Sequence, residues 1–91
     1  GRPHERRRVM SAVDTFPRLR AVIHDATGYE PAEILPDAPL AEAIPDSLDR
    51  FEAILGAEEE FGVEISDAEA EAMQTVADFV ALIDRKRGIA A

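Results

Sequence analysis

The 91-residue sequence contains no cysteine and is poor in basic side chains, with 10 Lys and Arg against 19 Asp and Glu. Without cysteine the chain has no disulfide, no thiolate metal ligand and no thiol nucleophile, so any thiol chemistry requires a cofactor that brings its own sulfur. The formal charge of −9 disfavours binding to nucleic acid or to an anionic membrane, because both attract basic proteins. A basic protein partner is the natural complement of such a charge.

Long hydrophobic runs are also missing. No segment approaches the ~20 apolar residues that a membrane-spanning helix requires, and no signal-peptide core is visible. We therefore expect a cytoplasmic protein. The chain length indicates a single domain with a modest hydrophobic core.

The charges are unevenly distributed along the chain. Residues 1–8 hold four Arg and one Glu, whereas residues 42–78 hold twelve acids and a single base. Because the N-terminal stretch has no apolar period, we expect residues 1–12 to be a disordered basic arm or a cloning remnant. We expect residues 13–88 to form the folded domain and residues 89–91 to form a C-terminal tail.

Helical periodicity is the main structural signal of the sequence. Apolar residues spaced by three and four predict a helix near residues 15–27. Thr15 is its expected N-cap, Pro17 is expected in its first turn, and Gly28 is expected just beyond its end.

Four prolines in residues 28–45 exclude a long helix in this stretch. We expect an ordered loop with room for one short turn of helix. Long loops in small domains are often functional. The apolar residues expected to anchor this loop in the core are Ile34, Leu35, Leu40 and Ile44.

Two further segments carry signals for the start of a helix. Residues 47–61 follow Asp46 as the expected N-cap, with Asp49 forming an acidic variant of the capping box. An S-x-x-E capping box at 66–69 opens a short helix near 67–72.

The last helix is expected to begin after Thr75 and to end in three cations followed by Gly88, which suits a helix C-terminus. No strand-like alternation and no repeat is present. The predicted fold class is therefore all-α, a four-helix bundle with a long loop between its first two helices and a short third helix.

Ser47 lies at the start of the second helix, within the sequence PDSLD at 45–49. Backbone N–H groups and the positive end of the helix dipole converge there, which favours a phosphate group on the hydroxyl. A serine in the first turn is also common in helices without such a function. These residues alone leave both interpretations open.

The wider context of Ser47 resembles the acyl carrier protein family. Residues 46–83 read DSLDRFEAILGAEEEFGVEISDAEAEAMQTVADFVALI, in which the family's D-S-L attachment motif is Asp46-Ser47-Leu48. The helix ending in EEEFG, the EISD turn and the TVADFVALI helix follow at the family's spacing. Residues 15–28 match the family's first helix more weakly, so the resemblance extends over most of the chain.

The resemblance implies a function. In this family a separate phosphopantetheinyl transferase moves 4′-phosphopantetheine from coenzyme A to the serine of the motif, here Ser47. The thiol of that group carries acyl chains as thioesters in fatty-acid, lipid or polyketide-type biosynthesis. The chemistry belongs to partner enzymes, so we expect a monomeric carrier and no enzyme. The alternative is a carrier-like protein–protein interaction module that is never modified.

The resemblance also implies that the second helix is a docking surface for basic patches on acyl-transferring and acyl-modifying enzymes. Electrostatic steering requires such an acidic surface, although a run of charges is also typical of a solvated helix face. The expected partner-binding residues are Asp46, Leu48, Asp49, Phe51, Glu52, Leu55, Glu58 and Glu59.

The chain departs from the family's pattern at two places. Many members have Leu-Gly and one further residue before D-S-L, whereas this chain has Ala43-Ile44-Pro45. The loss of the glycine changes the backbone conformations available ahead of the serine and indicates a specialised carrier. Arg50 is the second departure, a base where the acidic helix face begins.

The core beneath the second helix carries unusually small residues, Ala53, Gly56 and Ala57. We expect Phe79 of the last helix to fill part of this space. We also expect a residual apolar pocket that widens around an acyl chain, because apolar cavities accept apolar guests.

Two other kinds of site are disfavoured. Asp67, Glu69 and Glu71 lack the glycine turn and the ligand spacing of an EF-hand, so we expect no metal site. No G-x-S-x-G elbow surrounds Ser47, which argues against a serine hydrolase, and we expect no catalytic residue.

Overall fold

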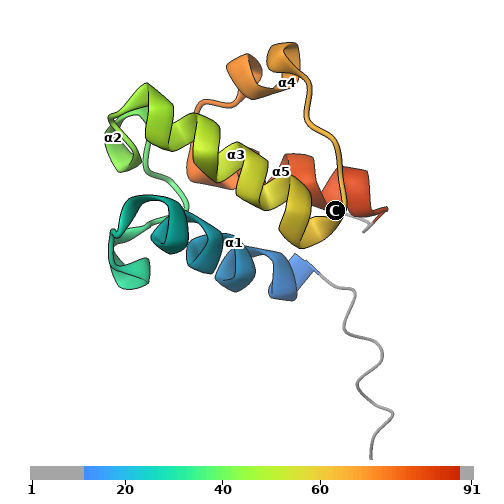
Figure 1. The fold of residues 1–91 in the computed structure, drawn as a ribbon. Helices are drawn as coiled ribbons and strands as arrows, with labels where there is room; N and C mark the ends of the chain where they lie inside the picture. The colour runs from blue at the N-terminus through green and yellow to red at the C-terminus, as the bar shows by residue number, and fades with distance from the viewer. Residues whose placement is uncertain (1–11, 89–91) are drawn as a thin grey trace, which may run out of the picture.

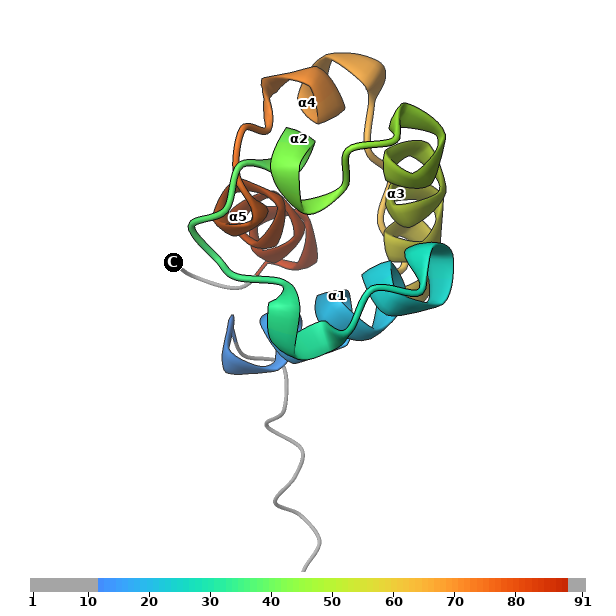
Figure 2. The same cartoon turned by 90° about the vertical axis from the view of Figure 1, so that its left-hand side faces the viewer.

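The computed structural model describes residues 12–88, which form five α-helices and one 3₁₀ helix. The elements, in chain order, are α1 (Ala12–Thr27), η2 (Pro31–Glu33), α2 (Leu40–Ala43), α3 (Ser47–Phe61), α4 (Asp67–Ala72) and α5 (Val76–Arg87). In both views α3 and α5 lie between α1 and the short α4 (Figures 1 and 2). The predicted all-α bundle is confirmed, with α2 as an additional turn inside the long first connection. The predicted N-terminal arm and C-terminal tail lie outside the described residues, apart from Ala12, with which α1 begins.

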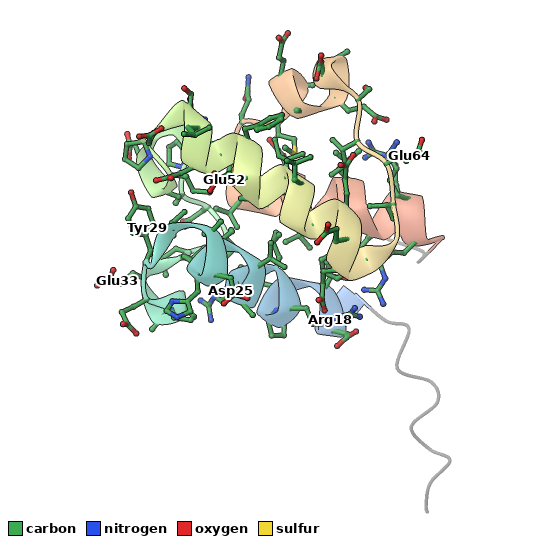
Figure 3. The ribbon with its side chains drawn as sticks, in the orientation of Figure 1. Arg18, Asp25, Tyr29, Glu33, Glu52 and Glu64 are labelled. Atoms are coloured by element: carbon green, nitrogen blue, oxygen red, sulfur yellow. The ribbon has the colours of Figure 1, made fainter. Side chains whose placement is uncertain are left out.

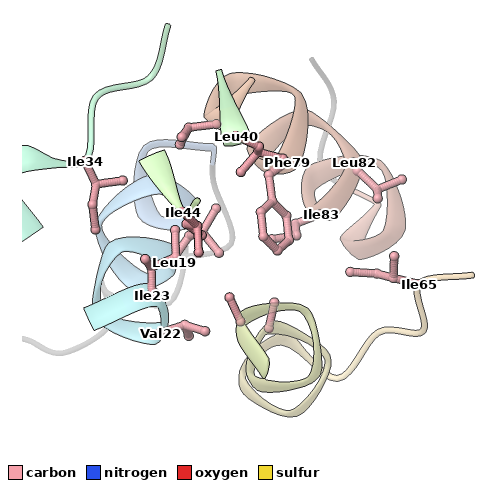
Figure 4. Close-up of a cluster of buried hydrophobic side chains, with 13 residues drawn as sticks. Leu19, Val22, Ile23, Ile34, Leu40, Ile44, Ile65, Phe79, Leu82 and Ile83 are labelled. Carbon is pink, nitrogen blue, oxygen red and sulfur yellow. The ribbon is translucent and has the colours of Figure 1, made fainter. Parts of the chain in front are cut away.

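The hydrophobic core lies where α1, α3, α5 and the first connection meet. Phe79 points from α5 into the centre of this cluster (Figure 4) and is 1% exposed. Replacing such a buried aromatic by alanine costs about 3–5 kcal/mol, so Phe79 is a main source of stability. The buried apolar residues are Leu19, Val22, Ile23, Ile34, Leu40, Ile44, Ala53, Ala57, Ile65, Val76, Phe79, Leu82 and Ile83.

The start of α1 differs from the sequence-based prediction. The helix begins at Ala12, so Thr15 lies inside it and Pro17 lies in the second turn. Thr15 is fully buried; its hydroxyl donates to the carboxyl of Asp84 on α5 and accepts from Arg87 Nη1 at 2.9 Å. The predicted N-cap is therefore wrong, because Thr15 satisfies a buried carboxyl instead of the helix N-terminus.

Helix α1 and helix α3 approach each other closely at Gly56. A Cβ atom at this position would lie 2.9 Å from Val22 Cγ1, which is shorter than a normal carbon–carbon contact. The absence of a side chain at Gly56 thus lets the two helices pack together.

The first connection is ordered by contacts with the core and with α5. Ile34, Leu40 and Ile44 are buried as predicted, but Leu35 is 50% exposed and is no anchor. The residues around the loop's prolines accept and donate backbone hydrogen bonds at the start of α5: Val76 N–H donates to Ala38 O, Ala77 N–H to Pro36 O, and Leu40 N–H to Gln74 O. These bonds satisfy N–H groups that a helix N-terminus leaves unpaired.

Apart from the start of α1, the helix termini follow their local sequence signals with one exception. The capping boxes that open α4 (Ser66 with Glu69) and α5 (Thr75 with Asp78) are both present. Gly28 and Gly88 adopt positive φ angles of 83° and 79° after α1 and α5, as predicted.

The exception is the start of α3. Asp46 caps this helix as predicted, but its carboxylate accepts from Leu48 N–H at 2.8 Å. The predicted capping box with Asp49 is therefore wrong. Asp46 satisfies the nearer N–H group of the first turn and leaves Asp49 without a capping role.

Candidate functional site

Ser47 is the first residue of α3 and is exposed. Asp46 fixes the backbone just ahead of it through the capping bond to Leu48. The hydroxyl therefore projects from a rigid helix terminus, where the helix dipole stabilises a negatively charged substituent. This arrangement suits a serine that another macromolecule has to reach.

A cleft of about 630 Å³ opens beside Ser47, between α2, α3 and α4. Its walls are mostly apolar and its mouth carries a few polar groups, which is the usual composition of a small-molecule site. The lining residues are Pro39, Leu40, Ala41, Ile44, Ser47, Arg50, Phe51, Ile54, Asp67, Ala70, Glu71, Met73, Gln74 and Phe79.

The position of this cleft corrects one sequence-based prediction. Phe79 is buried and lines the cleft as expected, but Ala53, Gly56 and Ala57 do not line it. Ala53 and Ala57 are fully buried, and Gly56 is packed against α1. The cavity lies instead on the α4 side of α3, because Ala53 and Ala57 are already covered and Gly56 faces α1.

Helix α4 and Met73, the residue that follows it, contribute side chains that the sequence analysis did not assign to a site. Ala70 and Met73 are partly buried against the core and line the cleft. Their spacing of three residues is a helical apolar pair, a signal that the short segment carries but that its acidic neighbours obscure.

A salt bridge holds α4 to α5. Lys86 Nζ lies 2.8 Å from Glu69 Oε1. The Lys86 ammonium, together with the backbone N–H of Ser66, lowers the pKa of Glu69 to about 2. At the start of α5 the N–H groups of Gln74 and Thr75 likewise lower the pKa of Asp78. The ionised carboxylates of Glu69 and Asp78 thus help to hold α4 and the start of α5 beside the cleft.

The outer face of α3 carries an apolar stripe. Leu48, Phe51 and Leu55 are 61%, 55% and 44% exposed. Their spacing places them on one side of the helix, and Phe51 also lines the cleft. Large apolar side chains that remain exposed together on a helix are typical of an interaction surface.

Carboxylates flank this stripe. Asp46, Glu52 and Glu59 are exposed, and Asp49 is half-buried. Glu52, labelled in Figure 3, shares a groove between α1 and α3 with Asp25.

Glu58 has a structural contact as well. It is half-buried and one of its carboxylate oxygens accepts from Ile65 N–H at 2.8 Å. The α3 face thus combines exposed apolar side chains with exposed acids. Glu58 differs from these acids, because its carboxylate also holds the loop that follows α3.

Other kinds of site find little support in the described part of the chain. Within residues 12–88 no group of three or more His, Cys, Asp or Glu side chains is arranged to hold a metal ion. Among the same residues, no helix is both long and apolar enough to cross a membrane.

Ser47 is thus an exposed serine at a helix start, beside a mostly apolar cleft. The family described as the phosphopantetheine attachment site matches residues 17–83. The acyl carrier protein of Solidesulfovibrio magneticus is 43% identical over 72 residues, covering 78% of this chain and 92% of that protein. The acyl carrier protein of Thermosynechococcus vestitus is 40% identical over 78 residues, covering 85% of this chain and 96% of that protein. The chain belongs to the acyl carrier protein family, and the predicted resemblance is confirmed.

The prosthetic group of this family is 4′-phosphopantetheine, and the residues around Ser47 fit it. The serine is exposed, so a transferase can reach its hydroxyl. The cleft that begins at Ser47 offers apolar walls along α3 and α4 to whatever the group carries. Proteins of this family are carriers whose partners are acyl-handling enzymes and a phosphopantetheinyl transferase.

The Lys86–Glu69 salt bridge leads to a prediction about pH. Because the folded pKa of Glu69 lies below its ordinary value of 4.5, the bridge stabilises fully above about pH 4.5 and is lost as pH falls through about 2. We expect Lys86→Met to lower the urea midpoint of unfolding at neutral pH and the difference from wild type to shrink towards zero near pH 2.

Urea titrations of both proteins across this pH range test the prediction. Comparing variant with wild type cancels the general effect of protonating other carboxylates. Arg85→Met, an exposed cation one residue away, serves as the control and should show a small difference. A loss of stability in Lys86→Met that stays constant down to pH 2 would contradict the assignment.

Proposed function

We propose that the protein carries acyl groups on 4′-phosphopantetheine joined to the hydroxyl of Ser47. The observation that carries the proposal is the exposed position of Ser47 as the first residue of α3, within Asp46-Ser47-Leu48 and at the edge of the cleft. When attached, the group supplies a terminal thiol that holds acyl chains as thioesters, which this cysteine-free chain lacks.

The protein's own residues supply position and charge in this function. Asp46 caps α3 and fixes the backbone next to Ser47. The N-terminus of α3 favours the phosphate that the serine would bear. We propose that the chain is a carrier without catalytic activity, because the bond-making groups belong to its partners.

Docking of partners is proposed to use the outer face of α3. Leu48, Phe51 and Leu55 offer exposed apolar contact, and the carboxylates around them attract basic patches on other proteins. Two exposed acids, Glu52 and Glu59, are best placed for this attraction. Glu58 would contribute less, because it already accepts from Ile65 N–H.

The cleft between α2, α3 and α4 is proposed to shelter the acyl chain. Its lining includes Leu40, Ile54 and Met73, and burying an apolar chain is favourable by about 0.8 kcal/mol for each methylene removed from water. We further propose fatty-acid, lipid or polyketide-type biosynthesis as the pathway and a monomer in the cytoplasm as the working form, as the sequence resemblance and composition suggest.

The first prediction concerns the attachment point. We expect Ser47→Ala to abolish loading from coenzyme A by a broad-specificity phosphopantetheinyl transferase, measured by intact mass. The fold should remain, since Asp46 keeps the helix cap, and circular dichroism melting checks this. Ser66→Ala, which removes the cap of α4, should still be loaded. Loading of Ser47→Ala, or no loading of the wild type, would reject the proposal.

The second prediction concerns docking. We expect Glu52→Lys and Glu59→Lys to slow association with the transferase and with acyl-handling partners, and wild-type association to weaken as salt rises. Stopped-flow association rates at several salt concentrations measure both effects. Glu33→Lys makes the same change of charge on η2, at an exposed site (Figure 3), and should have a smaller effect. Equal rates for all three variants would contradict docking on α3.

The third prediction concerns the cleft. We expect acyl loading to raise the Tm of the wild type, because the chain covers apolar surface in the cleft. Ala70→Leu should erase this gain, since Ala70 lines the cleft, whereas Ala72→Leu on the same helix should keep it, since Ala72 does not. Melting curves of unloaded, phosphopantetheinylated and acylated forms test this. A gain that survives Ala70→Leu unchanged would exclude the cleft as the acyl site.

A further inference from the structure

Arg50 binds the chain just ahead of Ser47. Its side-chain Nη1 donates to the carbonyl oxygen of Ile44 at 2.5 Å and to that of Pro45 at 3.1 Å. Its backbone N–H donates to the carbonyl oxygen of Asp46 at 3.0 Å. The side chain of Arg50 therefore binds two successive carbonyl groups ahead of the serine, and its backbone N–H closes the first turn of α3.

These contacts explain why a cation is present at an unfavourable place. A positive charge in the first turns of a helix opposes the helix dipole, and Arg50 is the only base among residues 42–78. Ile44 is fully buried, and a buried carbonyl without a donor is costly. Pro45 cannot donate a backbone hydrogen bond of its own. The guanidinium supplies the donors that this segment lacks.

The same side chain lies beside the serine. Arg50 and Ser47 both line the cleft, and Arg50 is half-buried. The segment that Arg50 holds leads directly into Ser47, the first residue of α3. The cation and this segment thus form one structural unit next to Ser47.

We propose that Arg50 is a positioning residue for the modification of Ser47: by holding residues 44–46 against α3, it keeps the serine hydroxyl where the transferase requires it. This proposal rests on the proposed function of Ser47. In the transfer, Ser47 Oγ forms a bond to the phosphorus on the pantetheine side of the coenzyme A pyrophosphate. The bond from that phosphorus to the nucleotide bisphosphate breaks, and the serine proton passes to a base on the transferase.

The expected effect is on turnover and not on docking. Displacing a reacting group by about 1 Å can slow a reaction about a hundredfold. We expect loss of the Arg50 side-chain contacts to lower kcat for loading about tenfold or more. The KM for the carrier should stay within about twofold of wild type, because the exposed residues of α3 that meet the partner are unchanged.

The test compares loading kinetics of Arg50→Met, Arg50→Lys and wild type with coenzyme A and a broad-specificity transferase, after melting curves establish that each variant is folded. Arg50→Met keeps a long apolar stem without donors. Arg50→Lys retains an ammonium that can donate to both carbonyl groups and should restore most of kcat. Arg85→Met removes the same charge from an exposed site on α5 and should behave as wild type. If Arg50→Met proves unfolded, Arg50→Gln, whose shorter amide cannot reach both carbonyls, replaces it.

The outcomes separate the possible roles of Arg50. A fall in kcat that lysine rescues supports positioning. An unchanged kcat in Arg50→Met would overturn the proposal. A lower KM with an unchanged kcat would also overturn it, because Arg50 would then act only by making the docking face less acidic. Wild-type protein that is not loaded at all would refute the proposed function itself, and the role of Arg50 with it.

Discussion

The backbone hydrogen bonds between the first connection and the start of α5 determine where the functional site lies. The carbonyl groups of Pro36 and Ala38 accept from the first N–H groups of α5, and Leu40 N–H donates to Gln74 O. They hold α2 so that Leu40 enters the core. Since α2 also forms one wall of the cleft and leads directly into Ser47, the proposed attachment site is built on this junction and not on α3 alone.

A second contact fixes the opposite end of the bundle. Thr15 on α1 bridges Asp84 and Arg87 on α5, and the Arg87 guanidinium also lies 5.1 Å from the centre of the Phe61 ring at the end of α3. Buried polar groups are costly unless they are paired, so this network favours one arrangement of the three long helices. The functional end, with α2, α4 and the cleft, is left with fewer buried contacts: α4 contributes no fully buried residue.

Structure that depends on contacts between residues close in the sequence could be predicted. Structure that depends on contacts between residues far apart in the sequence could not. The Ser66 capping box and the helix that follows it could be predicted, because donor and acceptor lie within four residues. The role of Thr15 could not, since its partner Asp84 is 69 positions away. Leu35 was expected in the core because an irregular loop has no period to indicate which apolar residues face inward. Arg50 looked anomalous because its acceptors are backbone carbonyl groups, which no residue type reveals.

Basic and acidic side chains have different roles in this structure. The cations that make internal contacts are Arg18, Arg20, Arg50, Lys86 and Arg87. Each of these side chains donates to a carbonyl group, a hydroxyl or a carboxylate of the same chain, so its charge is partly compensated inside the fold. Acids such as Glu52 and Glu59 remain exposed on α3. These exposed acids supply the negative charge of the proposed docking surface on α3, and charge of this kind steers basic partners.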